Sequence, residues 1–329
     1  MRWLLLVAVC GCDGDLAVAV DAAAVDAHVV DAAPSKFGRC NASTPRAEIT
    51  NGRLIDAAAA GALIAAPDLA LWPADGGASI ALPGVPETAV LSGTALYWRG
   101  TGDVVVEHAL AGAERTIPVG TGGLPATIVR GDGAVYVVTT TAPARIERIA
   151  PGGSAELVAT SASPISNLAV GGGLLVWQEG ADIRTASTTL LTDASARLLG
   201  LHDDTFVVQS AGAFAFYRLA DGGLARTIAW DAPIASAVLG PHAIYIAMDR
   251  RETMIGEQWC SIQPTVARLA LSDGTSMPLV TEPERVIAAP DQAYVQTAGE
   301  HGHTCCSGHG MFSCNEQSIE PTAVWCFAD

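Results

Sequence analysis

Gly133-Ala-Val-Tyr136-Val137 and Thr94-Ala-Leu-Tyr97-Trp98 follow one short pattern, in which a small or turn residue leads into an apolar run that reaches a tyrosine. Tyr245 and Tyr294 end two further runs of this kind. The spacing is 39 residues from Tyr97 to Tyr136 and 49 residues from Tyr245 to Tyr294, and the 109 residues between Tyr136 and Tyr245 leave room for two more copies. Short apolar runs at a spacing of roughly 40 residues indicate a repeat built from strands.

Aligned on the tyrosine position, the sequence contains seven copies of the pattern. Their closing residues are Ile64, Tyr97, Tyr136, Val176, Val207, Tyr245 and Tyr294. In five copies a proline precedes the closing residue by 11 or 12 positions, at Pro86, Pro125, Pro164, Pro233 and Pro283. We expect a first strand between the proline and the closing residue, such as Thr127-Ile-Val129, then a glycine or polar turn and a second strand.

A second hairpin follows in several copies. Its turns are Ala74-Asp-Gly-Gly77, Pro151-Gly-Gly153, Asp221-Gly-Gly223 and Ser272-Asp-Gly274. Glycine supplies the positive φ angles that such tight turns need. Each copy therefore predicts about four short antiparallel strands, which make one blade of a β-propeller. The predicted fold is all-β with seven blades, and six blades is the alternative if the Ile64 copy or the last unit is not a full blade.

The order of apolar strand, glycine turn, Leu96-Tyr97-Trp98 and a later Gly-Gly hairpin resembles YWTD-type propeller repeats. Such repeats occur in lipoprotein-receptor ectodomains and in many bacterial extracytoplasmic proteins. The resemblance covers residues 52–329, and Tyr97-Trp98 is the copy that carries the Tyr-Trp pair. It implies a propeller outside the cytoplasm.

The N-terminus has one positive charge, Arg2, and a short apolar run, which is typical of a secretory signal. The segment resembles a bacterial lipoprotein signal, in which small residues precede a lipidated cysteine. Cys12, which follows Gly11, fits this pattern better than Cys10, which follows Val9. The resemblance implies a signal peptide over residues 1–12, lipidation at Cys12 (palmitate or a similar acyl chain) and a membrane-anchored protein of the cell envelope. A plain secreted protein is the alternative.

Residues 13–36 are rich in Ala, Asp and Val, and aspartates recur every five residues at Asp21, Asp26 and Asp31. This spacing matches neither the helical nor the strand period. We interpret the segment as a flexible tether, with a partner-binding repeat as the alternative. Residues 37–329 are predicted to form a single propeller domain, whose last unit, 298–329, is rich in Cys and His.

The chain has a net charge of −16. Its first 36 residues hold five aspartates, Arg2 and Lys36, a net −3, which leaves −13 for the predicted domain. An acidic surface repels phosphate backbones, so nucleic acid is not an expected partner. Lys36 is the only lysine. We attribute the preference for arginine to genome composition, not to a site, and we expect a monomer.

Six cysteines follow the proposed lipid site: Cys40, Cys260, Cys305, Cys306, Cys314 and Cys326. An even number in an exported chain predicts disulfides, with fifteen connectivities open. Cys260 and Cys305 follow the second strands of adjacent units, so we predict that Cys260 pairs with Cys305 or Cys306. A closed ring brings the two ends of the domain together, so we also predict a bridge from Cys40 into the C-terminal segment.

Three histidines, His301, His303 and His309, lie among these cysteines and are candidate zinc or copper ligands. No Cys-x₂-Cys pair accompanies them, and exported thiols are usually oxidised. We therefore interpret the segment as a disulfide-stapled loop with exposed histidines, and a metal site remains the alternative.

The sequence contains no G-x-S-x-G, H-E-x-x-H or P-loop motif. Arg130-Gly131-Asp132 spells an integrin-type tripeptide but falls at a predicted turn, and the charged pair Asp203-Asp204 is interpreted as an exposed turn. We predict a non-enzymatic extracytoplasmic lipoprotein without a cofactor, whose propeller binds a protein or glycan at the cell envelope. The alternatives are a hydrolase or lyase with catalytic residues on loops, and metal binding by the C-terminal segment.

Overall fold

The apolar runs form short antiparallel strands, and most strands pair with the next one along the chain. The structure is a computed structural model. It describes residues 47–49, 52–65, 68–74, 78–120, 125–139, 142–248, 251–255, 258–262, 265–281, 283–289, 292–297, 300–301, 305–308, 311–313, 318–319 and 322–328. All of these belong to one unit, Phe37–Asp329.

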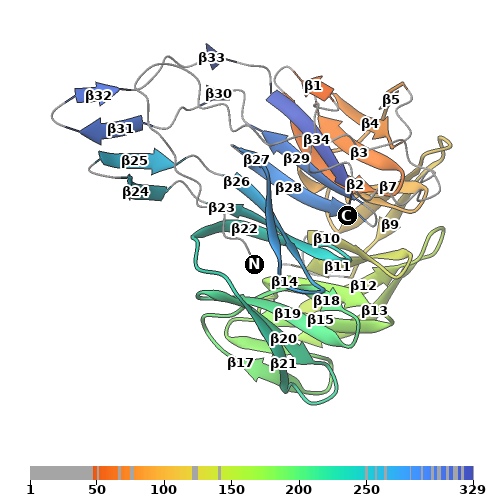
Figure 1. Cartoon of the computed structure of the whole chain (residues 1–329). Helices are drawn as coiled ribbons and strands as arrows, with labels where there is room; N and C mark the ends of the chain where they lie inside the picture. Colours follow the sequence, from red (N-terminus) through yellow and green to blue (C-terminus); the bar gives the residue numbers. More distant parts are fainter. Residues whose placement is uncertain are drawn as a thin grey trace, which may run out of the picture. The chain divides into compact units, whose positions relative to one another are not determined.

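Seven sheets of four strands each make up the repeat, and they follow one another in chain order (Figure 1). Blade 1 contains β2 (Arg53–Ala58), β3 (Gly61–Ala65), β4 (Leu69–Pro73) and β5 (Ile80–Ala81). Blade 2 contains β6 (Val90–Ser92), β7 (Ala95–Arg99), β8 (Val104–Ala109) and β9 (Glu114–Pro118), and the 3-10 turn η2 (Pro86–Thr88) precedes it. Blade 3 contains β10 (Pro125–Gly131), β11 (Ala134–Thr139), β12 (Ala144–Ile149) and β13 (Ala155–Ser161). Blade 4 contains β14 (Asn167–Gly171), β15 (Leu174–Glu179), β16 (Asp182–Arg184) and β17 (Thr189–Thr192).

The remaining blades have the same four-stranded form. Blade 5 contains β18 (Arg197–His202), β19 (Thr205–Ser210), β20 (Ala213–Arg218) and β21 (Leu224–Ala229). Blade 6 contains β22 (Ile234–Leu239), β23 (Ala243–Met248), β26 (Thr265–Ala270) and β27 (Ser276–Thr281). Blade 7 contains β28 (Pro283–Ala289), β29 (Gln292–Thr297), β34 (Thr322–Ala328) and β1 (Ala47–Ile49).

The first strand of each blade contacts the first strands of the blades before and after it, and β28 of blade 7 contacts β2 of blade 1. This closes the ring around a central axis that the first strands line. The predicted seven-bladed, all-β propeller with four-stranded antiparallel blades is confirmed, and the six-bladed alternative is wrong because the Ile64 copy and the last unit are both full blades.

The ring closes with a strand that the sequence analysis did not assign. β1 supplies the outermost strand of blade 7, and Ala47 lies opposite Val324 in the antiparallel pair with β34. The predicted repeat began at residue 52, after this strand. A strand of three residues is too short to show a periodic pattern, which explains why it was missed.

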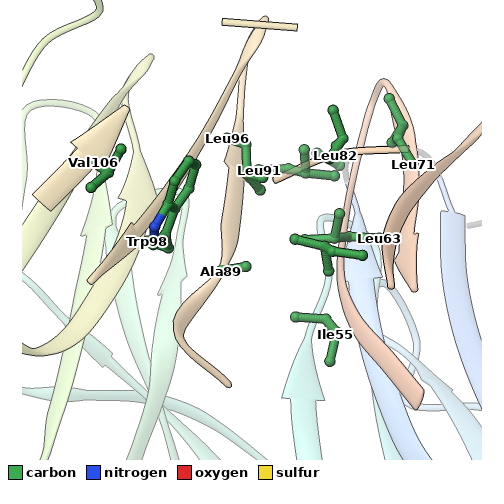
Figure 2. Packing of buried hydrophobic residues seen from close by; sticks show 11 residues of the cluster. Ile55, Leu63, Leu71, Leu82, Ala89, Leu91, Leu96, Trp98 and Val106 are labelled. Atoms are coloured by element: carbon green, nitrogen blue, oxygen red, sulfur yellow. The ribbon is translucent and has the colours of Figure 1, made fainter. Parts of the chain in front are cut away.

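All seven closing residues lie on the second strand of their blade, and each is at most 5% exposed. The second strand is covered by the neighbouring blades on both sides, so its run is apolar on both faces. Between blades 1 and 2, Leu63 and Leu71 face Leu91, Leu96 and Trp98 across the interface (Figure 2). Burying each large side chain contributes roughly 1.5–3 kcal/mol. The residues that repeat in the sequence are therefore the ones that pack between neighbouring blades.

Blades 6 and 7 carry insertions between their second and third strands. β24 (Arg251–Ile255) and β25 (Gln258–Ile262) come from blade 6, and β31 (Cys305–Gly308) and β32 (Met311–Ser313) from blade 7. These four strands form a separate sheet in which β25 pairs with β31 (Figure 1). β30 (Glu300–His301) pairs with β33 (Ser318–Ile319). The described part of the chain holds no helix with the length and hydropathy of a membrane span.

Candidate functional site

A charged clasp joins four blades near the central axis. Arg130 on β10 places Nη1 at 3.0 and 2.9 Å from the two carboxylate oxygens of Asp56 on β2. Its Nη2 donates to the carbonyl oxygen of Ala288 on β28 at 3.1 Å. The backbone N–H of Leu91 on β6 donates to Asp56 Oδ2 at 2.8 Å. The Asp56–Arg130 clasp therefore ties blades 1, 2, 3 and 7 together.

Asp56 and Arg130 are mostly withdrawn from solvent, with side chains 14% and 29% exposed. Burial raises the pKa of Asp56 above the usual aspartate value, while the charge of Arg130 and the N–H groups of Leu91 and Ala57 act in the opposite direction. The two side chains are in direct contact and are hydrogen-bonded to two further strands, β6 and β28. The Asp56–Arg130 clasp is therefore a rigid part of the structure.

A cavity of about 420 Å³ opens where the first strands of these four blades begin, and we call it the axial cavity. Three arginines line it: Arg53 on β2, Arg99 at the end of β7 and Arg285 on β28. Its acidic lining residues are Glu87 and Asp56. Ile55, Val90 and Ile128 contribute apolar wall.

The three guanidinium groups differ in their partners. Arg53 lies 3.7 Å from Glu87, and both side chains are largely exposed. Arg99 donates from Nη1 to the carbonyl oxygen of Pro125 at 3.1 Å, and Arg285 donates from Nη2 to that of Ile55 at 2.9 Å. Within the described part of the chain, neither Arg99 nor Arg285 forms an ion pair.

Arg285 sits in an environment that disfavours its own charge. Loss of hydration and then repulsion from Arg53 lower the pKa of Arg285 below the usual arginine value, and Asp56 opposes the shift. The guanidinium stays charged because its ordinary pKa lies far above neutrality. Two close cations that are only partly balanced favour the entry of an anion between them.

Bulges at the beginning of the first strands position this lining. Register shifts occur in blades 1, 3 and 7, at Leu54/Asp56, Pro125/Thr127 and Pro283/Arg285. A bulge adds an unpaired residue, so it changes which side chains face the axis and which face the blade interface. This explains how both Arg53 and Asp56 of one short strand reach the same cavity.

A second cavity of about 600 Å³, the peripheral cavity, lies between blades 5 and 6 at the opposite end of the strands. Arg226 packs its guanidinium 4.1 Å from the centre of the Phe216 ring and donates to the carbonyl oxygen of Leu271 at 2.6 Å. His202 lies 3.4 Å from Asp203, which with Asp204 lines this cavity. The predicted exposed turn thus lies at the rim of the peripheral cavity, and Arg226, one of the two arginines that line this cavity, is already bound by the protein.

The integrin-type tripeptide is structural. The side chain of Arg130 forms the clasp, and a Cβ atom at Gly131 would meet Val170 Cβ at 2.5 Å. Asp132, with a φ of 48°, accepts the backbone N–H groups of Gly172 and Gly173 in the next blade at 3.1 and 2.8 Å. All three residues therefore have structural contacts within the propeller.

We expect Asp132→Ala to lower the free energy of unfolding by about 1–2 kcal/mol, because two N–H groups lose a charged acceptor that bridges blades 3 and 4. Urea unfolding followed by tryptophan fluorescence measures the change. Asp132→Asn is the matched control, since its amide oxygen still accepts one of the two bonds and should recover part of the loss. Equal stability of Asp132→Ala and the wild type would contradict this interaction.

Half of the predicted Cys/His sites lie outside the residues that the structure describes. His301 falls on β30 and Cys260 on β25, whereas Cys12, Cys40, Cys314, His303 and His309 are outside the described residues. The backbone register of β25 and β31 places Cys260 opposite Cys306, with Cys305 opposite Ser261. Cys326 on β34 is buried and disulfide-bonded. The lipid site, the metal ligands and the disulfide pairings therefore stay predictions.

The residues of the axial cavity were not predicted from the sequence, and the preference for arginine was attributed to genome composition. The available signal was the presence of Asp56, Arg130 and Arg285 inside first strands, where charged side chains lie among mainly apolar and small residues. A charge in a strand next to the axis needs a partner across the axis. Without the ring, these three residues are 74 and 155 positions apart and cannot be grouped.

No family model and no curated protein matches this sequence. A chain in the crystal structure of the mitotic checkpoint complex is similar in fold, with a TM-score of 0.55, 14% identity, and coverage of 92% of this chain and 98% of that chain. The WD40 β-propeller domain of Doa1 matches with a TM-score of 0.50 and 13% identity, over 79% of this chain and 93% of that chain. Hsv2 of Kluyvelomyces marxianus matches with a TM-score of 0.50 and 8% identity, over 82% and 98%. At such low identity, these comparisons show a seven-bladed β-propeller that resembles WD40-type propellers.

Proposed function

We propose that this protein is a non-enzymatic binding scaffold at the cell envelope, anchored by lipid at Cys12, and that it binds an envelope glycan at the axial cavity. The observation that supports the proposal is the axial cavity itself, where Arg99 and Arg285 form no ion pair with a described carboxylate and lie near the Asp56–Arg130 clasp. The opening of a propeller's central channel is a concave place of the kind where small ligands commonly bind.

The size of the axial cavity favours a glycan over a protein partner. About 420 Å³ lies within the range of small-ligand sites, roughly 300–1,000 Å³, and accommodates one or two sugar rings. A protein partner would need about 800 Å² of surface on each side, far more than this cavity supplies. We therefore narrow the expected partner, a protein or glycan, to a glycan.

Co-sedimentation tests this function. The full chain, purified in detergent, is mixed with cell-wall glycan stripped of protein, and the pelleted fraction is measured. We expect the wild type to pellet with the glycan, and the Arg99→Gln/Arg285→Gln variant to remain in solution. Arg148→Gln is the control, because Arg148 on β12 lines neither cavity. Pelleting of the double variant at the wild-type level, or release of reducing ends from the glycan, would contradict the proposal.

Anchoring is tested separately by Cys12→Ser. The variant cannot be acylated at this position, so we expect it to lose incorporation of labelled palmitate and to leave the membrane fraction. Several acyl chains at about 0.8 kcal/mol per buried CH₂ give stable anchoring, which the protein portion does not replace. Cys10→Ser is the matched control and should stay in the membrane fraction. Retention and labelling of Cys12→Ser would place the anchor elsewhere.

A further inference from the structure

We propose that the axial cavity recognises an anionic sugar group with two negative charges, carried by carboxylates or by a phosphate. This inference rests on the proposed binding of a glycan at the axial cavity. It assigns a ligand chemistry to Arg53, Arg99 and Arg285.

The charges around the axial cavity do not cancel. Asp56 is neutralised by Arg130 beneath the cavity, and Glu87 is close to Arg53. Arg99 and Arg285 remain as two cations without a carboxylate among the described residues. Among the described residues, the net local charge is thus close to +2, and a dianion matches it.

This local charge stands out against the rest of the chain. The predicted domain carries a net charge of −13, so an anion approaching most of its surface is repelled. A hollow lined by the opposite sign concentrates the field and selects anionic ligands over neutral ones. Arginine suits this role, because its planar fork of donors matches carboxylate and phosphate oxygens.

Arg99 and Arg285 are fixed before any ligand arrives. Each uses one terminal nitrogen to bind a backbone carbonyl oxygen, that of Pro125 or that of Ile55, which leaves the other donors of the group for a ligand. The backbone N–H of Arg99 also donates to Thr88 Oγ1 at 3.0 Å. Side chains ordered in advance lose less entropy on binding.

The remaining wall is suited to a sugar body. Val90 and Ile128 are partly buried apolar side chains of β6 and β10, and Thr88 and Thr127 supply hydroxyl groups beside them. Apolar walls with a few fixed polar groups are typical of small-ligand sites. The lining therefore combines two arginines that can bind an anion, Arg99 and Arg285 (the anion clamp), with an apolar surface against which a sugar ring can pack.

Isothermal titration with the full chain in detergent, in a zwitterionic buffer at fixed ionic strength, tests the inference. The probes are digalacturonate, its uncharged dimethyl ester and inorganic phosphate. We expect saturable binding of digalacturonate, and at least tenfold weaker binding of the ester. Arg99→Gln/Arg285→Gln should weaken digalacturonate binding at least tenfold, and Arg148→Gln should leave it unchanged. Circular dichroism checks that both variants are folded.

The outcomes separate the inference from the proposed function. Phosphate binding tighter than digalacturonate, and lost in the double variant, supports the anion clamp with a phosphate source. Equal binding of the ester and the acid overturns the inference that the ligand is anionic, and it does not contradict the proposed binding of a glycan. Absence of binding by both anions overturns the inference, and co-sedimentation with wall glycan then decides the proposed function alone. Anion binding that survives in the double variant also overturns it.

Discussion

Arg130→Met will lower the free energy of unfolding by about 3–5 kcal/mol, because it leaves the carboxylate of Asp56 buried without its counter-charge. Among the described residues, Asp56 then keeps the N–H groups of Leu91 and Ala57 as its hydrogen-bond donors. Ala288 on β28 also loses its donor, so blades 1, 2, 3 and 7 lose their shared connection. Urea unfolding at pH 7 measures the change.

Two variants decide whether the charge causes this loss. Asp56→Asn/Arg130→Met removes both charges, so we expect it to recover at least half of the lost stability. Arg148→Met makes the same substitution on β12, at a residue outside both cavities, and should change stability by less than about 1 kcal/mol. If the double variant is no more stable than Arg130→Met, the loss comes from packing and not from an unpaired charge.

Cys326→Ala will lower the free energy of unfolding by about 2–4 kcal/mol under oxidising conditions, because it removes a disulfide from the closing blade. Cys326 is buried on β34, which is held between β29 and the short strand β1. If its partner is Cys40, as the sequence predicts, this cross-link limits how far the two ends of the ring separate in the unfolded chain. Thermal unfolding of the oxidised and reduced proteins measures the effect.

The predicted bridge from Cys40 into the C-terminal segment gives this experiment its control. If Cys40 is the partner of Cys326, Cys40→Ala should destabilise the protein equally, and the double variant should be no less stable than either single variant. Cys260→Ala should act independently and add to either change. Normal stability of Cys40→Ala beside a destabilised Cys326→Ala would assign the partner to another cysteine.

The sequence predicted the fold well because the repeat is a packing pattern. Tyr97, Tyr245 and Tyr294 occupy equivalent places between blades, so equivalent burial selects equivalent residues. The glycine hairpins were also predictable, because their tight turns use positive φ angles that glycine adopts readily: Gly222 and Gly274 have φ of 68° and 72°. β1 was missed because three residues carry no period.

By itself, the sequence predicted seven blades, with six as the alternative, and it predicted the second strand of each blade, because the blade pattern recurs in residues that lie close together in the chain. The tertiary structure alone decided the candidate site. Asp56, Arg130 and Arg285 belong to blades 1, 3 and 7 and meet only because the ring is closed and its first strands share an axis. A blade is specified by residues close together in the sequence. A site at the axis depends on contacts between residues of different blades, which do not occupy equivalent positions of the repeat.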